Sequence, residues 1–288
     1  MADGPTYLAG VVVPAHDEER TIGRLLDALT GDHDAPLDIV VAANGCTDAT
    51  AAVARAHTPE VTVVETPVPG KPAALVLGDA ASTVYPRVYV DADVEISARG
   101  VAALAKAVAG DGVLAAGPVR RVPREGIATL VRWYYDVWEL LPQVRTGLFG
   151  RGVIALSEAG HARVRALPTM MSDDLVVSEA FSDRERTIVA EAVVVVHPPR
   201  TTRDLVRRRV RVATGNAQAD AAGLRAPTAT TGVRTLLGIA VEHPRAAPKL
   251  LVFVAVTLVA RTQARRAVRR GDFNTWLRDE SSRSDARG

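Results

Sequence analysis

Residues 7–29 read YLAGVVVPAHDEERTIGRLLDAL, and this stretch decides the fold. Three consecutive β-branched residues, Val11–Val13, lie in an apolar run that stops at Pro14, which predicts a buried strand over residues 7–13. From Glu18 onward, apolar side chains recur at helical spacing. These are Ile22, Leu25, Leu26 and Leu29. A strand, a polar loop and an amphipathic helix in this order form the repeating unit of an α/β protein.

The same unit repeats along the chain. Further strands are predicted over residues 37–42, 61–65, 87–90, 113–118, 149–156 and 193–196. Further helices are predicted over residues 48–57, 72–82, 97–109, 127–141 and 201–222, with a short helix before Pro168 and another ending at Phe181. Alternation of this kind predicts a mostly parallel sheet with helices on both faces. We expect this α/β sheet domain to occupy residues 1–199.

The charge of the chain is unevenly distributed, although its net charge is only +2. Residues 1–199 contain 17 Lys and Arg against 26 Asp and Glu, whereas residues 200–288 contain 18 against 7. We therefore expect a basic helical region over residues 200–278, followed by a polar, disordered tail over 279–288. Two interpretations of the basic surface stay open, a solvated helical face or an attraction for phosphates, nucleic acid or anionic lipid.

The most apolar stretch of this region is Leu250–Ala260, LLVFVAVTLVA. Because it has 11 residues between Lys249 and Arg261, it is shorter than the roughly 20 residues that span a membrane. We expect either a buried helix or an interfacial helix whose arginines face anionic lipid. These arginines are Arg261, Arg265, Arg266, Arg269 and Arg270.

Cys46 is the single cysteine of the chain, which excludes an intramolecular disulfide and a multi-cysteine zinc site. The N-terminal residues lack the basic segment and long apolar run of a secretory signal. We therefore expect a cytoplasmic protein, either free or peripheral at the inner face of the membrane. No nucleic acid partner is expected.

Polar clusters follow four predicted strands, where ligands of open α/β sheets bind. The fourth strand delivers Asp91 and Asp93 in the sequence VDADVEIS. Two carboxylates separated by one residue can share a metal, and hard oxygen ligands select Mg²⁺ or Mn²⁺. A turn or a helix cap made of Asp residues is the alternative for this short motif.

Three other loops offer groups for a nucleotide. Lys71 lies between Gly70 and a predicted helix start, where anions are favoured. Asn44 and Asp48 follow the second strand and offer donors and acceptors to a base or ribose, although Asp48 also suits a helix cap. Asp17 or Glu18 supplies an acceptor for the nucleoside, unless Glu18 and Glu19 only begin a helix.

Together these four loops resemble the glycosyltransferase family 2 domain of the GT-A fold. The segments that carry the resemblance are VVVPAHDEERTIGRLLDAL, VVAANGCTDATAAVA, PGKPAALVLG and VDADVEIS, within residues 7–97. The resemblance implies a nucleotide-diphospho-sugar donor bound through a divalent metal. It further implies nucleotide-binding roles for Pro14, Ala15, Glu18, Asn44, Asp48 and Lys71, with Asp93 the firmer metal ligand. The family usually has paired acids before Gly-Ser where this chain has Ala43-Asn44-Gly45-Cys46, which leaves the base open.

Two later segments extend the resemblance. MMSDDLVVSEAF is similar to the acidic motif of the family, which implies that Asp174, with Asp173 beside it, deprotonates the acceptor hydroxyl. Adjacent acids also repel each other, which can raise one pKa toward a useful value. His197 is similar to the late metal-ligand histidine of some GT-A enzymes, although a lone histidine at a strand end also serves structural roles.

The sequence thus predicts a metal-dependent, inverting glycosyltransferase with an acceptor that is a glycan, a lipid-linked sugar or a small molecule. Two alternatives stay open, a sugar-phosphate nucleotidyltransferase and a catalytically weak scaffold that binds nucleotide sugars or associates with a membrane. The acidic loop PAHDEER disfavours the first, because nucleotidyltransferases usually carry a glycine-rich basic loop there. The intact Asp91, Asp93 and Asp174 disfavour the second.

Overall fold

The computed structural model describes residues 6–59, 61–167, 173–221, 223 and 231–269, and of Asp173 only the backbone. The chain divides into two compact units. The sheet unit comprises residues 1–122, 151–167 and 181–196, and the helical unit comprises residues 123–150, 168–180 and 197–288. The predicted division into domains at residue 199 stays a prediction, and the tail over 279–288 lies outside the described residues.

The sheet unit is built on an eight-stranded sheet with the order β3-β2-β1-β4-β7-β6-β8-β5. The strands are β1 (Ala9–Ala15), β2 (Leu37–Asn44), β3 (Thr62–Thr66), β4 (Arg87–Val90), β5 (Val94–Glu95), β6 (Ala115–Arg121), β7 (Val153–Leu156) and β8 (Arg186–Val196). Pairing is parallel between β1 and β2, β1 and β4, β2 and β3, and β6 and β8. Since only β7 and β5 run against their neighbours, the predicted mostly parallel sheet is confirmed.

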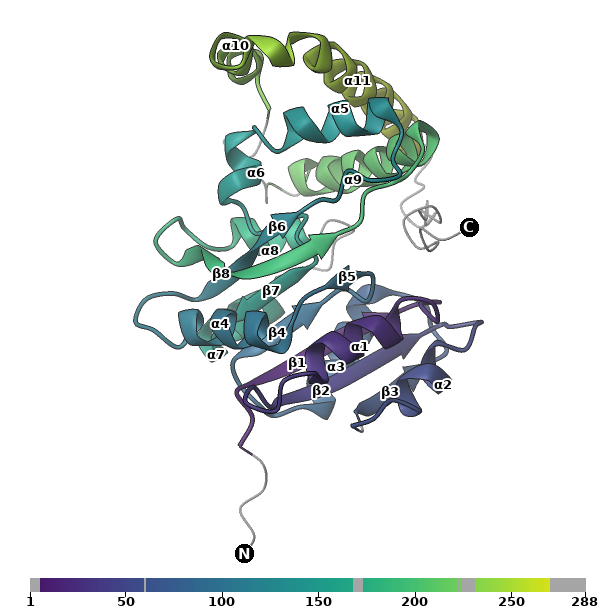
Figure 1. Cartoon of the computed structure of the whole chain (residues 1–288), viewed down its shortest axis with the longest axis vertical. Coiled ribbons are helices and arrows are strands. Elements are labelled where there is room, and N and C mark those ends of the chain that lie inside the picture. The colour runs from purple at the N-terminus through teal and green to yellow at the C-terminus, as the bar shows by residue number, and fades with distance from the viewer. Residues whose placement is uncertain (1–5, 60, 168–172, 222, 224–230, 270–288) are drawn as a thin grey trace, which may run out of the picture. The chain divides into compact units, whose positions relative to one another are not determined.

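Helices cover both faces of this sheet (Figure 1). They are α1 (Ile22–Thr30), α2 (Thr50–Arg55), α3 (Lys71–Ala81), α4 (Ala98–Val108) and α7 (Glu158–Arg165). The buried stripe of α1 packs with Val11 and Val13 in the core, whereas α3 lies against the face that carries Val12. A Cβ atom at Gly78 of α3 would lie 2.4 Å from Cγ1 of Val12, so only glycine permits this close approach.

The loop between β1 and α1 differs from the prediction, because α1 begins at Ile22 and not near Glu18. The backbone N–H of Glu18 donates to Oγ1 of Thr50, and the carbonyl of Glu18 accepts from the N–H groups of Thr21 and Ile22. Residues 16–21 therefore form a fixed loop at the carboxyl end of β1. This loop is part of the candidate site.

The helical unit contains α5 (Thr129–Trp138), α6 (Pro142–Thr146), α8 (Asp173–Glu179), α9 (Thr202–Ala221), α10 (Val233–Glu242), the 3₁₀ turn η2 (Pro244–Ala246) and α11 (Ala247–Arg269). α11 packs on α5 and α9. Tyr134 stacks on Phe253 with 5.0 Å between ring centroids, and Nζ of Lys249 lies 2.8 Å from Oδ2 of Asp136. The predicted C-terminal helical appendage is present. Residues 123–150 belong to the same compact unit, although they lie far before it in the sequence.

The helical stretch Pro244–Arg269 is long and apolar enough to cross a membrane by length and composition, with a mean hydropathy of 1.3. This alone is weak evidence of a span, because core helices of soluble proteins meet the same criterion. α11 buries Leu250, Phe253 and Val256 on one side, whereas Leu251 and Leu258 are exposed on the other. One side of the apolar run is therefore buried and the other exposed, and the predicted contact with lipid stays a prediction.

Candidate functional site

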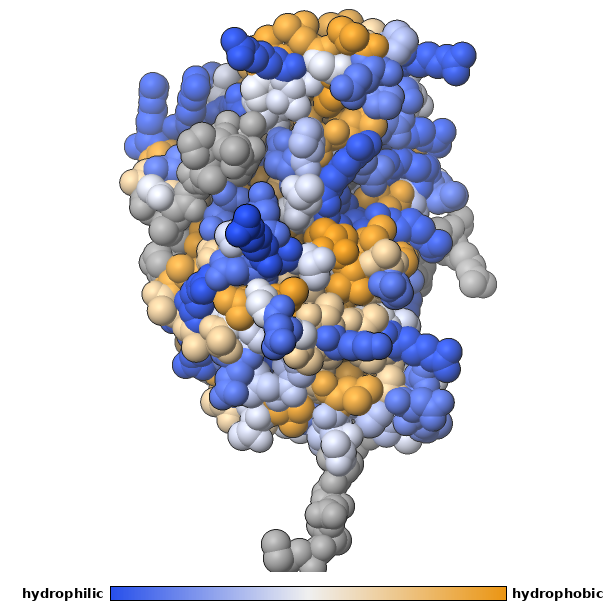
Figure 2. All heavy atoms as spheres, turned by 90° about the vertical axis from the view of Figure 1, so that its left-hand side faces the viewer, coloured by the Kyte–Doolittle hydropathy of each residue, from blue (hydrophilic) through white to orange (hydrophobic). Residues whose placement is uncertain are grey.

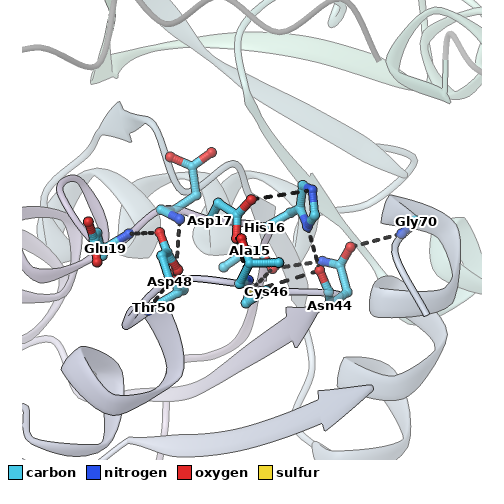
Figure 3. Close-up of polar contacts among 11 residues, drawn as sticks. Ala15, His16, Asp17, Glu19, Asn44, Cys46, Asp48, Thr50 and Gly70 are labelled. Carbon is cyan, nitrogen blue, oxygen red and sulfur yellow. Dashed lines mark hydrogen bonds and ion pairs between the residues drawn. The ribbon is translucent and has the colours of Figure 1, made fainter. Parts of the chain in front are cut away.

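The carboxyl ends of β1, β2 and β4 lie side by side, because β1 pairs in parallel with both neighbours. Ala15 at the end of β1 is in register with Ala43 near the end of β2. β2 pairs in turn with β3, which precedes the loop that carries Gly70 and Lys71. The sheet unit thus brings the four predicted loops to one edge, and Figure 3 shows three of them in contact.

Asn44 joins three of these loops through its buried side chain (Figure 3). Its Nδ2 donates to the carbonyl of Ala15 at 2.8 Å, and its Oδ1 accepts from the N–H of Gly70 at 2.9 Å. One amide therefore serves as donor to the first loop and acceptor for the third, which an aspartate in its ionised form cannot do. Asn44 fixes the positions of the loops, and its predicted contact with a base stays a prediction.

Lys71 and Asp91 form an ion pair, with 2.8 Å between Nζ and Oδ1. Lys71 is the first residue of α3 and follows the positive-φ residue Gly70. The cation thus lies at a helix N-terminus, whose N–H groups also favour anions. The third motif and the aspartates after β4 therefore lie side by side, and their predicted role toward a diphosphate stays a prediction.

Asp91 and Asp93 are half-buried, whereas Ala92 between them is buried in the core. The N–H of Asp91 donates to the carbonyl of Gly152 at 2.7 Å. Gly152 has φ +68°, and a Cβ atom there would lie 3.3 Å from Oδ2 of Asp91 and 2.6 Å from Cγ1 of Val94. The absence of a side chain at Gly152 therefore leaves room for the carboxylate of Asp91. This role was not predicted from the sequence.

Arg151, beside Gly152, is also buried, and its Nη1 donates to the carbonyl of Pro118 at 2.7 Å. Burial, together with the nearby charge of Arg120, lowers the pKa of Arg151 to about 9. The sequence pattern that could have pointed to this loop is an arginine between two glycines, Gly150-Arg151-Gly152. In the structure both glycines have positive φ. It places a desolvated cation next to the residues that support Asp91.

Glu18 and Asp48 have structural partners within the same loops. Oε2 of the buried Glu18 accepts from Oγ1 of Thr21 at 2.8 Å. Oδ1 of Asp48 accepts from the N–H of Thr50, the first residue of α2, at 2.9 Å, although the N-cap position of α2 is Ala49, and Oδ2 of Asp48 accepts from the N–H of Glu19. Their predicted roles toward a nucleoside stay predictions.

Asp17 links the first loop to the second. Its Oδ1 accepts from the N–H of Thr47 at 2.6 Å and from Oγ1 of Thr47 at 3.2 Å. Asp17 has φ +49°, a conformation that non-glycine residues rarely adopt. Beside Asp17, the half-buried Pro14 and the buried Ala15 end β1. Loop contacts thus hold Asp17 at the edge where the nucleotide was predicted to bind.

Asp174 and His197 belong to the helical unit. Oδ2 of Asp174 accepts from the N–H of Gly150 at 2.7 Å, and Oδ1 accepts from the N–H of Leu175 at 2.8 Å, so the carboxylate is fixed at the start of α8. His197 follows β8 directly, and its carbonyl accepts from Nη1 of Arg208 on α9 at 3.2 Å. The side chain of Asp173 lies outside the described atoms.

The family model that matches this sequence is "Glycosyl transferase family 2", over residues 10–157. The chain belongs to this family. It is therefore a glycosyltransferase with the GT-A fold, as the motifs of the four loops predicted. The matched residues include all four loops and the Gly150-Arg151-Gly152 segment. No curated protein sequence matches the chain.

Solved structures of glycosyltransferases share the fold. A mannosyltransferase from Pyrobaculum calidifontis, in complex with GDP-Man and Mn²⁺, is similar with a TM-score of 0.61 and 21% identity, covering 93% of this chain and 84% of that one. Glucosyl-3-phosphoglycerate synthase from Mycobacterium tuberculosis, in complex with Mn²⁺, UDP and phosphoglyceric acid, has a TM-score of 0.52 and 24% identity, covering 71% of this chain and 76% of that one. At these identities, the similarity shows the fold alone.

Proposed function

We propose that this family 2 enzyme transfers a sugar from a nucleotide-diphosphate donor, bound through a divalent metal, to an acceptor hydroxyl. The observation that carries the proposal is the contact between Lys71 and Asp91, with 2.8 Å between Nζ and Oδ1. It joins the cation of the third motif to the aspartates after β4, and such a cluster suits a diphosphate with its metal. The nucleotides bound in similar structures, GDP-Man in one and UDP in the other, each with Mn²⁺, agree with this class of donor.

Asp91 and Asp93 would hold the metal. Their half-buried carboxylates offer the hard oxygen ligands that Mg²⁺ and Mn²⁺ prefer, and Gly152 leaves space beside Oδ2 of Asp91. His197 is proposed as a further ligand, since it follows Val196, the partner of Val94 in the antiparallel pair of β8 and β5. A bound metal would stabilise the negative charge that develops on the leaving diphosphate. Lys71 supplements that charge.

The remaining residues bind the nucleoside and activate the acceptor in this proposal. Glu18 offers a carboxylate to the nucleoside in this proposal, while Asn44 holds the loops that surround it. Asp174 takes the proton of the acceptor hydroxyl, and Asp173 lies beside it in the sequence. A single displacement of this kind inverts the configuration at the anomeric carbon. The acceptor is a glycan, a lipid-linked sugar or a small molecule.

We expect a nucleotide sugar to raise the thermal stability of the chain, and to do so far more with Mn²⁺ than with a chelator. A donor at about 100 times its Kd stabilises the folded state by about 2.7 kcal/mol. A panel of nucleotide sugars in thermal-shift assays measures this effect and identifies the base and the sugar. Free sugar and nucleoside monophosphate are the controls. Equal shifts with Mn²⁺ and with chelator would contradict the metal-bound donor.

We also propose that α10 and α11 place the enzyme at an anionic membrane surface on the cytoplasmic side. Val233, Leu237 and Val241 of α10 recur every fourth residue and are 74%, 61% and 81% exposed. Figure 2 shows hydrophobic side chains at the end of the molecule where α10 lies, with hydrophilic ones around them. The exposed arginines of α11 favour anionic lipid over a second, equally basic copy. These are Arg261, Arg265, Arg266 and Arg269.

The membrane proposal predicts binding to vesicles that contain phosphatidylglycerol, and much weaker binding to neutral phosphatidylcholine vesicles. Replacing Arg265 and Arg266 by alanine removes about 2 kcal/mol of attraction, or about 30-fold in the partition coefficient. Cosedimentation measures this change, and alanine at the exposed Arg121 and Arg184 of the sheet unit is the matched control. Equal binding to both vesicle types, or a stable dimer in place of binding, would contradict the proposal.

A further inference from the structure

We propose that His16, Asp17 and Cys46 form a second metal site, which binds a borderline-soft divalent cation such as Zn²⁺. One ligand atom of each residue, a ring nitrogen, a carboxylate oxygen and the sulfur, lies within 4.8 Å of the other two. Figure 3 shows the three residues on the adjoining loops after β1 and β2. This site is separate from the proposed Mg²⁺ or Mn²⁺ site, whose ligands are hard oxygen atoms of Asp91 and Asp93.

His16 has the arrangement that metal-binding histidines adopt. Its Nδ1 lies 2.7 Å from the carbonyl oxygen of Asn44. Because a carbonyl only accepts, Nδ1 must carry a proton, which makes Nε2 the ring nitrogen that can bind a metal. A histidine that binds metal through one ring nitrogen usually donates the other N–H to a carbonyl or carboxylate in this way. Asn44 therefore fixes both the tautomer and the orientation of the ring.

Asp17 faces the same point. Its Oδ2 lies 3.8 Å from Nε2 of His16, whereas its Oδ1 accepts two hydrogen bonds from Thr47. Two acceptor atoms that face each other are stabilised by a cation between them, either a metal or a proton on the histidine. The bonds from Thr47 also hold the carboxylate in place, as hydrogen bonds to ligating carboxylates do in metal sites.

Cys46 supplies the third ligand and decides the kind of metal. Its half-buried sulfur lies 3.5 Å from the carbonyl of Ala15 and 3.9 Å from that of Asn44, two weak contacts of a thiol. On binding the cation, the thiol loses its proton to water and the thiolate becomes the ligand. Thiolate, imidazole and carboxylate together select Zn²⁺ over Mg²⁺ or Mn²⁺. Three protein ligands leave a fourth position of the tetrahedron for water.

Co²⁺ is the spectroscopic probe for this site, because it replaces Zn²⁺ and reports its ligands. We expect the metal-stripped full chain to bind Co²⁺ with a thiolate charge-transfer band and the visible bands of four-coordinate cobalt, and Zn²⁺ to abolish both. Since Cys46 is the single cysteine of the chain, the band can come from no other residue. Cys46→Ser should remove the band, and His16→Ala should weaken binding by at least about 10- to 100-fold.

Asp93→Asn is the matched control, because it changes the other proposed metal site and should leave the cobalt spectrum intact. Circular dichroism and melting curves of each variant show whether it is folded. Co²⁺ bound without a thiolate band, or an unchanged band and affinity in His16→Ala, would overturn the proposal. The first outcome corresponds to an ion pair of protonated His16 with Asp17, and the second to a thiol that binds metal alone. Because the readout is ion binding, its failure is distinct from a failure of the proposed transferase activity.

Discussion

Asp93→Asn is expected to lower kcat/KM for the nucleotide-sugar donor by about 10²- to 10³-fold. An amide offers the metal a neutral oxygen where the aspartate offers a charged one, so the site loses affinity for Mg²⁺ or Mn²⁺. Charge stabilisation at a leaving group contributes about 2.7–4 kcal/mol in comparable sites, which corresponds to this change in rate. Donor turnover at several Mn²⁺ concentrations measures the effect, and high Mn²⁺ should recover part of the activity.

Asp111→Asn is the matched control, because Asp111 is an exposed aspartate in the turn after α4. The same chemical change there should leave donor turnover unaltered. The Mn²⁺-dependent thermal shift by the donor should disappear in Asp93→Asn and persist in Asp111→Asn. An Asp93→Asn enzyme that turns over donor at the original rate in the presence of chelator would refute the metal-bound donor. Loss of the fold would instead appear in the melting curve without donor.

The first half of the sheet could be predicted from sequence because its strands are continuous apolar runs. β4 begins and ends where predicted, and β1 and β2 end two residues later than predicted. The first half of β8 was missed, since residues 186–191 are half-buried or exposed and lack the apolar run that marked its end. β5 has two residues and gives no periodic signal. A run of apolar or β-branched residues is thus what made a strand recognisable.

The helical unit shows what sequence patterns leave out. α5 was predicted as part of a helix over residues 127–141, but its packing against α11 depends on pairs such as Tyr134 with Phe253, more than 100 residues apart. α10 was missed, although Val233, Leu237 and Val241 have helical spacing. Pattern analysis finds single elements, and the partner of each face is decided by long-range packing.

The residues of the candidate site were found by motif, but the roles of several depend on distant partners. Asn44 was predicted to offer donors and acceptors to a base or ribose, and the fold adds contacts of its amide with Ala15 and Gly70, which are 29 and 26 residues away. Gly152 was missed because its function is the space it leaves beside Asp91, 61 positions earlier in the sequence. Chemistry can be predicted from residue type and spacing, whereas support by a neighbouring loop requires the fold.

Asp174→Asn is expected to lower kcat by about 10²- to 10⁴-fold, with little change in donor affinity. General-base catalysis contributes this much, and an amide cannot take the proton of the acceptor hydroxyl. Asparagine at this position can still accept one of the two backbone hydrogen bonds, from Gly150 or from Leu175, but its amide nitrogen opposes the other N–H. We therefore also expect a loss of stability of about 1–3 kcal/mol.

Donor turnover and the donor-induced thermal shift, measured on the same preparation, separate the two effects of Asp174→Asn. A base removed from an intact site gives a normal shift with a low kcat, whereas a damaged fold lowers both. Asp183→Asn is the matched control, because Asp183 is an exposed aspartate of the sheet unit, paired with Arg186. If Asp174→Asn kept the original kcat, a group other than Asp174 would take the proton of the acceptor hydroxyl. The carboxylate at the start of α8 would then be structural, held by Gly150 and Leu175 as a helix cap.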